Sequence, residues 1–234
     1  VEHLGYLVAP NPVIEREVGM NESAVWDRLA GSYEAVVRVF DGAYPEVRGR
    51  LAADIDPKAE VLEVGAGTGQ FTWDLARSAG RVLATDVSIK MVERLHVKAA
   101  AARADNVTVA AMSAYALESP PDEFDVVVCA NALHVMERPE YALSEFRRVL
   151  RPDGLLIAPT FLHGVDWMRR TLSRALGLAS PFTAHTRFDR ETLGTLLKEQ
   201  GFEIVRLDVL SSIFPIGYAV ATPSGRSPYR PDFD

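Results

Sequence analysis

The sequence predicts an α/β protein with a doubly wound, mostly parallel sheet of seven strands, an antiparallel last strand and an N-terminal helical cap. From residue 60 onward, short apolar runs alternate with helical patterns, which is typical of strand–helix–strand units in a parallel sheet. The run 124–130 is apolar almost throughout, as expected of a strand covered on both faces. Two apolar stretches, 202–210 and 213–221, are joined by only two serines, and so short a connection permits only an antiparallel pair.

Residues 1–56 form the predicted N-terminal segment and helical cap. An irregular lead-in runs to Glu22, after which apolar residues recur at helical spacing. A glycine–serine pair at 31–32 divides this pattern into two helices. A third helix, 45–55, ends before Pro57, because the residue before a proline disfavours the helical conformation.

Residues 57–222 form the predicted core. We expect its strands at 60–64, 81–85, 107–111, 124–130, 155–158, 202–210 and 213–221. We expect its helices at 71–78, 89–104, 139–150 and 190–200. Residues 161–188 interrupt the alternation as an insertion on the substrate side that is long enough for a helix of its own. Residues 223–234, rich in proline and glycine, are predicted to be a flexible tail.

Composition narrows the possible function classes. The 234 residues are enough to bury one full core. The formal net charge is −7, which argues against a nucleic-acid partner because a phosphate backbone needs a basic face. No segment reaches the roughly 20 apolar residues of a membrane span, and the first ten residues do not resemble a signal peptide. The single cysteine, Cys129, suits a reducing compartment and an apolar core, so we expect a cytoplasmic protein.

A glycine loop follows the first predicted strand and is the first candidate for a binding site. Its glycines are Gly65, Gly67 and Gly69, and ligands of open α/β sheets bind beyond the carboxyl ends of the strands. The dinucleotide fingerprint G-x-G-x-x-G would need a glycine where Gln70 stands. Asp86 ends the second strand about 20 residues on, where a carboxylate can bind ribose hydroxyls. Two alternatives remain open: the loop is an empty tight turn, and Asp86 caps the next helix.

The segment E-V-G-A-G-T-G, residues 63–69, resembles motif I of the class I S-adenosylmethionine-dependent methyltransferases of the small-molecule type. Asp86, the F-D-V-V strand at 124–127 and the turn at 148–154 are also similar to that family. The resemblance covers roughly residues 26–221. It implies a Rossmann-like fold, S-adenosylmethionine as the cofactor, no metal, and a small-molecule methyl acceptor as the partner.

The resemblance also implies a set of cofactor-binding residues: Tyr33, Glu63, Gly65, Ala66, Gly67, Gly69, Asp86, Val87, Met91, Ser113, Ala114, Asn131 and Ala132. At one position the sequence departs from the family. An acidic residue commonly follows the third strand there and contacts the adenine amine, whereas this chain has Ser113, followed by Tyr115 where a second acidic residue is common. A hydroxyl can still accept that hydrogen bond.

Methyl transfer is an in-line displacement in which positioning supplies much of the catalysis. A base is needed if the acceptor carries a proton, and the candidate is His134, which lies just past the fourth strand. Its alternative role is packing or capping on the following helix. The candidate substrate residues are Phe40, His163, Trp167 and His185. The expected acceptor is an oxygen, nitrogen or sulfur atom of a small, partly apolar molecule.

Two other functions compete with this interpretation. A non-catalytic relative that binds the cofactor or acts as a scaffold would account for Ser113 and for the uncertain base. A nicotinamide-dependent oxidoreductase would use the glycine loop and Asp86, but Gln70 and the antiparallel end of the chain oppose it. The oligomeric state is left open.

Overall fold

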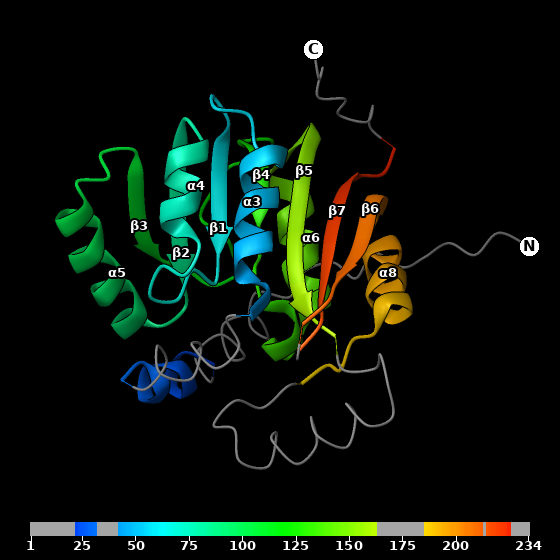
Figure 1. The fold of residues 1–234 in the computed structure, drawn as a ribbon, viewed down its shortest axis with the longest axis horizontal. Helices are drawn as coiled ribbons and strands as arrows, with labels where there is room; N and C mark the ends of the chain where they lie inside the picture. Colours follow the sequence, from blue (N-terminus) through cyan, green and yellow to red (C-terminus); the bar gives the residue numbers. More distant parts are fainter. Residues whose placement is uncertain (1–21, 32–41, 163–184, 213, 226–234) are drawn as a thin grey trace, which may run out of the picture.

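The computed structural model describes residues 22–31, 42–162, 185–212 and 214–225, which form a seven-stranded sheet in the order β3-β2-β1-β4-β5-β7-β6 (Figure 1). The strands are β1 (Glu60–Val64), β2 (Arg81–Asp86), β3 (Val107–Ala111), β4 (Phe124–Val128), β5 (Leu150–Phe161), β6 (Phe202–Leu210) and β7 (Ile216–Pro223). The helices are α3 (Tyr44–Asp54), α4 (Thr72–Ser78), α5 (Ile89–Ala102), α6 (Pro139–Val149) and α8 (Arg190–Glu199), with a short 3-10 helix η2 (Leu133–Val135). An earlier helix covers residues 22–29.

The strand pairing confirms the predicted parallel sheet with an antiparallel last strand. Strand β1 pairs in parallel with β2 and β4, and the parallel set continues through β3 and β5. Strand β7 is antiparallel to both of its neighbours, β5 and β6. Strand β7 therefore lies between β5 and β6, and β6 forms the edge of the sheet.

Helices cover both faces of the sheet. Helices α3, α4 and α5 pack on one face, and α6 and α8 pack on the other (Figure 1). Successive strand residues point to opposite faces, so Val61 packs beneath α3 and α4 while Leu62 packs toward α6. Because both faces are buried, the central strands are apolar at nearly every position.

Several boundaries differ from the sequence-based prediction, mostly by one to three residues, and those at the first helix, β5 and β7 change the description of the fold. The first helix already includes Glu22, so the predicted lead-in does not extend to that residue. Strand β5 begins at Leu150 because Leu150 pairs with Phe124, and the predicted turn 151–154 is accommodated by a register shift. Strand β7 begins at Ile216 and ends one residue inside the predicted tail.

Helix α3 belongs to the core. Its residues Tyr44, Val47 and Leu51 are buried against the sheet and α4, although the helix lies in the segment predicted as an N-terminal cap. Most of the predicted insertion, residues 163–184, and the tail beyond residue 225 lie outside the described residues.

Candidate cofactor and acceptor site

A cavity opens at the carboxyl ends of the parallel strands, beneath the helix of residues 22–29. This is the end of an open α/β sheet at which ligands bind. The cavity is lined by the glycine loop, by the residues that follow β2, β3 and β4, and by the first helix. These lining residues are Glu22, Trp26, Val64, Gly65, Gly67, Asp86, Val87, Met91, Met112, Ala114, Ala130, Asn131, Ala132, Val135 and Met136.

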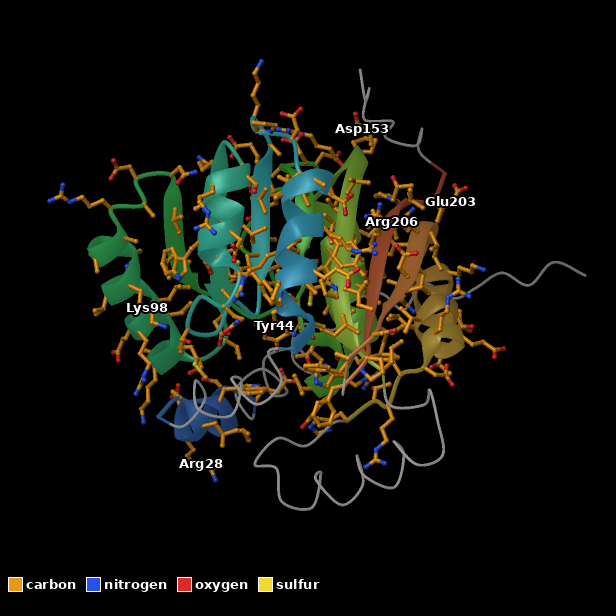
Figure 2. All side chains as sticks on the ribbon, in the orientation of Figure 1. Arg28, Tyr44, Lys98, Asp153, Glu203 and Arg206 are labelled. Atoms are coloured by element: carbon orange, nitrogen blue, oxygen red, sulfur yellow. The ribbon has the colours of Figure 1, made fainter. Side chains whose placement is uncertain are left out.

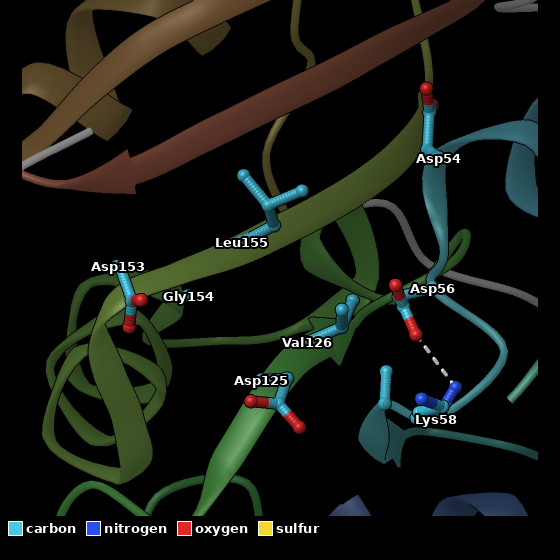
Figure 3. A pocket seen from close by; sticks show the side chains of 9 residues that line it. Asp54, Asp56, Lys58, Asp125, Val126, Asp153, Gly154 and Leu155 are labelled. Atoms are coloured by element: carbon cyan, nitrogen blue, oxygen red, sulfur yellow. Dashed lines mark hydrogen bonds between the residues drawn. The ribbon is translucent and has the colours of Figure 1, made fainter. Parts of the chain in front are cut away.

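A second hollow of about 230 Å³ lies at the opposite end of the sheet, among the aspartates Asp54, Asp56, Asp125 and Asp153 (Figure 3). These aspartates mainly close turns and ion pairs. Asp125 accepts from the Glu60 backbone nitrogen at 2.8 Å and pairs with Arg151, and Asp56 accepts from the Lys58 nitrogen at 2.7 Å. Among the described residues, no group of three or more potential ligands could hold a metal. Because this hollow lies away from the carboxyl ends of the strands and its aspartates are used in turns and ion pairs, we do not assign it a ligand.

The glycine loop is held in shape by backbone geometry and by a lysine. Gly67 has φ of 56° and Gly69 has φ of 91°, a region that L side chains adopt only with strain. A Cβ atom on Gly69 would lie 2.8 Å from Leu95 Cδ1 and 3.0 Å from Trp73. Lys98 of α5 donates to the Thr68 carbonyl at 2.9 Å. Gly67 lines the cavity, whereas Gly69 faces the packing beneath the loop.

Glu63, at the end of β1, connects the glycine loop to the start of α4. Its side chain is only 2% exposed and accepts a hydrogen bond from the Thr72 hydroxyl at 2.5 Å. Burial raises the pKa of this carboxyl to about 8, although the Thr72 bond acts in the opposite direction. Glu63 is not among the cavity-lining residues. The raised pKa favours the protonated carboxyl near neutral pH, and a direct contact of Glu63 with the cofactor stays a prediction.

Asp86 joins the loop to the start of α5. Its Oδ2 accepts from the Gly67 nitrogen and its Oδ1 from the Ser88 nitrogen, each at 2.9 Å. Burial raises the pKa of Asp86 to about 6, and these two bonds moderate the shift. The residue that caps α5 is Ser88, whose hydroxyl accepts from the Met91 nitrogen. Asp86 lines the cavity and orders the loop. The N-cap of α5, which the sequence offered as an alternative role for Asp86, is Ser88.

The residues after β3 are arranged around a local turn. The Ser113 hydroxyl accepts from the Tyr115 nitrogen at 3.2 Å, and Ser113 is not among the lining residues, although Met112 and Ala114 are. Tyr115 is buried, and its hydroxyl donates to Glu22. At this edge of the cavity the polar side chain therefore comes from the first helix.

Asn131 stands at the end of β4 in a left-handed conformation, with φ of 53°. Its Nδ2 donates to the Tyr44 hydroxyl at 3.0 Å. Its Oδ1 is buried and has no hydrogen-bond partner among the described residues. An unsatisfied buried acceptor is costly, so a donor from a bound molecule would complete this site.

Aromatic rings gather beside Asn131. The Tyr44 ring lies 5.1 Å from that of Phe71 and 6.5 Å from that of Phe161. Figure 2 shows Tyr44 at the end of α3 that is nearest the first helix, which carries Arg28. The cluster is thus built by the first residue before α4, by α3 and by β5, around the end of β4.

His134 lies in η2 and is only 9% exposed. Its ring meets Phe161 edge to face at 5.5 Å, and its carbonyl accepts from the Thr186 nitrogen at 3.1 Å. His134 does not line the cavity that the described residues enclose. The ring therefore packs against β5, whereas the sequence-based alternative is packing or capping on the following helix, and the role of a base remains a prediction.

Eight of the predicted cofactor residues line the cavity, namely Gly65, Gly67, Asp86, Val87, Met91, Ala114, Asn131 and Ala132. Glu63, Ala66, Gly69 and Ser113 do not line it. His185 is exposed, while Tyr33, Phe40, His163 and Trp167 lie outside the described residues.

The prediction missed seven lining residues: Glu22, Trp26, Val64, Met112, Ala130, Val135 and Met136. Val64, Met112 and Ala130 lie at strand ends, so the rule that ligands bind there would have found them. The spacing of the sequence holds no signal for the contact of Glu22 with residues about a hundred positions away.

Several known proteins with similar sequences or folds are described as methyltransferases. A family model described as a methyltransferase domain matches residues 61–154. The chain is 26% identical to the ubiquinone/menaquinone biosynthesis C-methyltransferase UbiE of Paraburkholderia xenovorans, with 90% of this chain and 94% of that protein covered. It is 30% identical to a malonyl-[acyl-carrier protein] O-methyltransferase of Halorhodospira halophila, with coverage of 74% and 59%.

A solved structure shows the same fold. It is a SAM-dependent methyltransferase of Thermotoga maritima, described as a possible histamine N-methyltransferase, with a TM-score of 0.66, 23% identity and coverage of 86% and 99%. The nicotinamide-dependent alternative finds no support in these relatives. None of the helices in the described parts of the chain is long and apolar enough to cross a membrane.

Proposed function

We propose that this chain, which belongs to the class I S-adenosylmethionine-dependent methyltransferases, methylates an oxygen, nitrogen or sulfur atom of a small, partly apolar molecule. We include a carbon atom as a further possible acceptor, because one relative is named a C-methyltransferase. The reaction and the cofactor follow from the family, whereas the acceptor is our proposal. A cytoplasmic location, which suits the buried thiol of Cys129, is part of the same proposal.

The residues that line the cavity fit the cofactor. When bound, S-adenosylmethionine supplies an electrophilic methyl group. In our assignment Asp86 accepts from the ribose hydroxyls, and the backbone at Gly65 and Gly67 lets the ligand approach closely. The buried Oδ1 of Asn131, which has no partner among the described residues, accepts from a polar hydrogen of the bound molecules.

The observation that carries the acceptor proposal is the cluster of Tyr44, Phe71, Phe161 and His134 beside Asn131. These rings are apolar on their faces, and the amide of Asn131 is polar. A binding site with mostly apolar walls and few polar groups is typical of small-molecule sites. Of these residues, only Asn131 is among the described residues that line the cavity, so the rings adjoin the site, and its apolar walls come from residues such as Ala132, Val135 and Met136. The acceptor that we propose for such walls has an aromatic or alkyl body and one polar reacting group.

The chain's own residues act mainly by positioning. Tyr44 holds Asn131 in place through a hydrogen bond of 3.0 Å, and the aromatic rings exclude water from the end of β4. In our assignment His134, three residues past Asn131, takes a proton from an acceptor that carries one. An acceptor that is already deprotonated needs no such base, and positioning alone then carries the rate.

The test is a screen for transfer of a labelled methyl group to phenols, thiols, amines, hydroquinones and lipid head groups. We expect turnover with an acceptor that has an apolar body, and one S-adenosylhomocysteine site per chain by titration calorimetry. Turnover restricted to strongly polar acceptors would contradict the proposed walls. No binding of S-adenosylhomocysteine to folded protein at millimolar concentration would defeat the whole proposal.

A non-catalytic, cofactor-binding relative remains the second candidate. It is favoured by the use of the Ser113 hydroxyl in a local turn and by the absence of His134 from the described cavity lining. Binding of S-adenosylhomocysteine without transfer to any acceptor of the screen would support it.

A further inference from the structure

Two carboxylates line the cavity among the residues that the structure describes, and one of them belongs to the predicted site. Asp86 lies at the end of β2, and Glu22 comes from the helix of residues 22–29. The same cavity is lined by the apolar side chains of Val87, Met91, Met112 and Ala114, and this apolar slot could sandwich a flat ring. A base attached to a ribose at Asp86 would therefore extend along this apolar slot toward Glu22.

Glu22 is held in place by two hydrogen bonds. Tyr115, buried after β3, donates its hydroxyl to Glu22 Oε1, and the backbone nitrogen of Glu137 donates to the same oxygen at 2.9 Å. Both bonds from the described residues end on Oε1. The second oxygen, Oε2, is therefore the one that can accept from a bound molecule.

The surroundings favour a ligand donor at this position. Burial raises the pKa of Glu22, and the charge of Glu22 in turn contributes to the raised pKa of Asp86. A partly desolvated carboxylate gains more from an N–H donor than an exposed one does. Ser113 accepts from the Tyr115 nitrogen and does not line the cavity, so among the described residues Glu22 is the side-chain acceptor at this edge.

We propose that Glu22 accepts a hydrogen bond from the exocyclic amine of the cofactor's adenine and so selects adenine over a base with a carbonyl at that position. This inference rests on the proposed function, because it assumes that S-adenosylmethionine occupies the cavity. The first helix thus takes part in base recognition, and Tyr115 is a positioning residue that orients the carboxylate.

A purely structural role for Glu22 is the competing explanation. The helix of residues 22–29 is also anchored to the start of α5 through Asp27. This carboxylate accepts from the Ser88 hydroxyl at 2.6 Å and from the Lys90 nitrogen at 3.2 Å. Asp27 does not line the cavity. It is therefore a matched control: a carboxylate on the same helix that can anchor the helix without touching the base.

The experiment compares the affinities of S-adenosylhomocysteine and S-inosylhomocysteine, whose base carries a carbonyl in place of the amine. Titration calorimetry is run on the wild type, Glu22→Gln and Asp27→Asn, with the melting temperature of each. Loss of a charged hydrogen bond corresponds to roughly 10- to 100-fold in affinity. We expect the wild type to prefer the adenine ligand by at least about 10-fold, and Glu22→Gln to lose most of that preference because an amide can also donate to the carbonyl.

Asp27→Asn should keep the preference, whatever its effect on total affinity. An unchanged preference in Glu22→Gln, or an equal loss of affinity for both ligands, would overturn the inference and leave Glu22 as an anchor of the helix. A wild type that binds both ligands equally would overturn it as well. A wild type that binds neither ligand would instead defeat the proposed function.

Discussion

Asp86 Oδ2 lies 2.9 Å from the backbone nitrogen of Gly67, so the carboxylate at the end of β2 orders the loop at the end of β1. The two strands are paired in parallel along their length, which brings their carboxyl ends to one edge of the sheet. A single side chain therefore both shapes the loop and faces the cavity.

Replacing Asp86 should weaken cofactor binding strongly. We expect Asp86→Ala to cost on the order of 1.5–3 kcal/mol in the binding of S-adenosylhomocysteine, because charged hydrogen bonds to the ribose are lost. Asp74→Asn is the control, since that carboxylate pairs with Arg48 and Arg77 away from the cavity. Affinity in Asp86→Ala equal to that of the wild type, measured by calorimetry, would remove the ribose assignment.

Two glycines of the loop should respond differently to the same change. Gly67 lines the cavity, so Gly67→Ala should lower cofactor affinity more than stability, with a folding cost of about 1–2 kcal/mol from its left-handed conformation. Gly69→Ala should lower stability more, because the new methyl group would meet Leu95 and Trp73. Thermal unfolding and calorimetry on both variants check this ordering. A larger stability loss in Gly67→Ala than in Gly69→Ala would contradict it.

The buried carboxyl of Glu63 should make the protein less stable as the pH rises. Its folded pKa of about 8 lies above the unfolded value of 4.5, so its stabilising effect is full below the unfolded pKa. That effect is lost as the pH rises through the folded pKa, at up to about 1.4 kcal/mol per pH unit.

Glu63→Gln should flatten this dependence, because the amide mimics the protonated carboxyl and can still accept from Thr72. We expect the variant to match the wild type near pH 5 and to exceed it in melting temperature near pH 8.5. Parallel melting curves at both pH values would show that Glu63 is charged in the folded protein.

His134→Ala separates chemistry from packing. If His134 is the base, kcat should fall by roughly 10²–10⁴-fold with cofactor affinity intact, and the wild-type rate should rise with pH as the imidazole loses its proton. His96→Ala is the control, since His96 is exposed on α5. If His134 only packs against Phe161, the variant should lose stability while the folded fraction turns over normally. An unchanged rate and pH profile would remove it from the mechanism.

Much of the site could be predicted because its determinants are close in sequence. The glycines at 65, 67 and 69 and the carboxylate of Asp86 come at the ends of their strands. Gly65, Gly67 and Asp86 line the cavity as expected, whereas Gly69 faces the packing beneath the loop. His134 shows the limit of such spacing. A position after β4 predicts nearness to the site, but the orientation of the ring depends on its packing against Phe161.

The sequence by itself determined the alternation of strands and helices, the antiparallel end and the glycine loop, because periodicity and turn chemistry act over a few residues. Only the tertiary structure decided that β7 lies between β5 and β6 and that Glu22 reaches Tyr115 across 93 positions of the chain. Only the tertiary structure likewise decided that Glu63 lies beneath the loop. Those outcomes depend on which apolar faces pack together. That packing also decides which polar atoms become neighbours, and no local sequence pattern encodes either one.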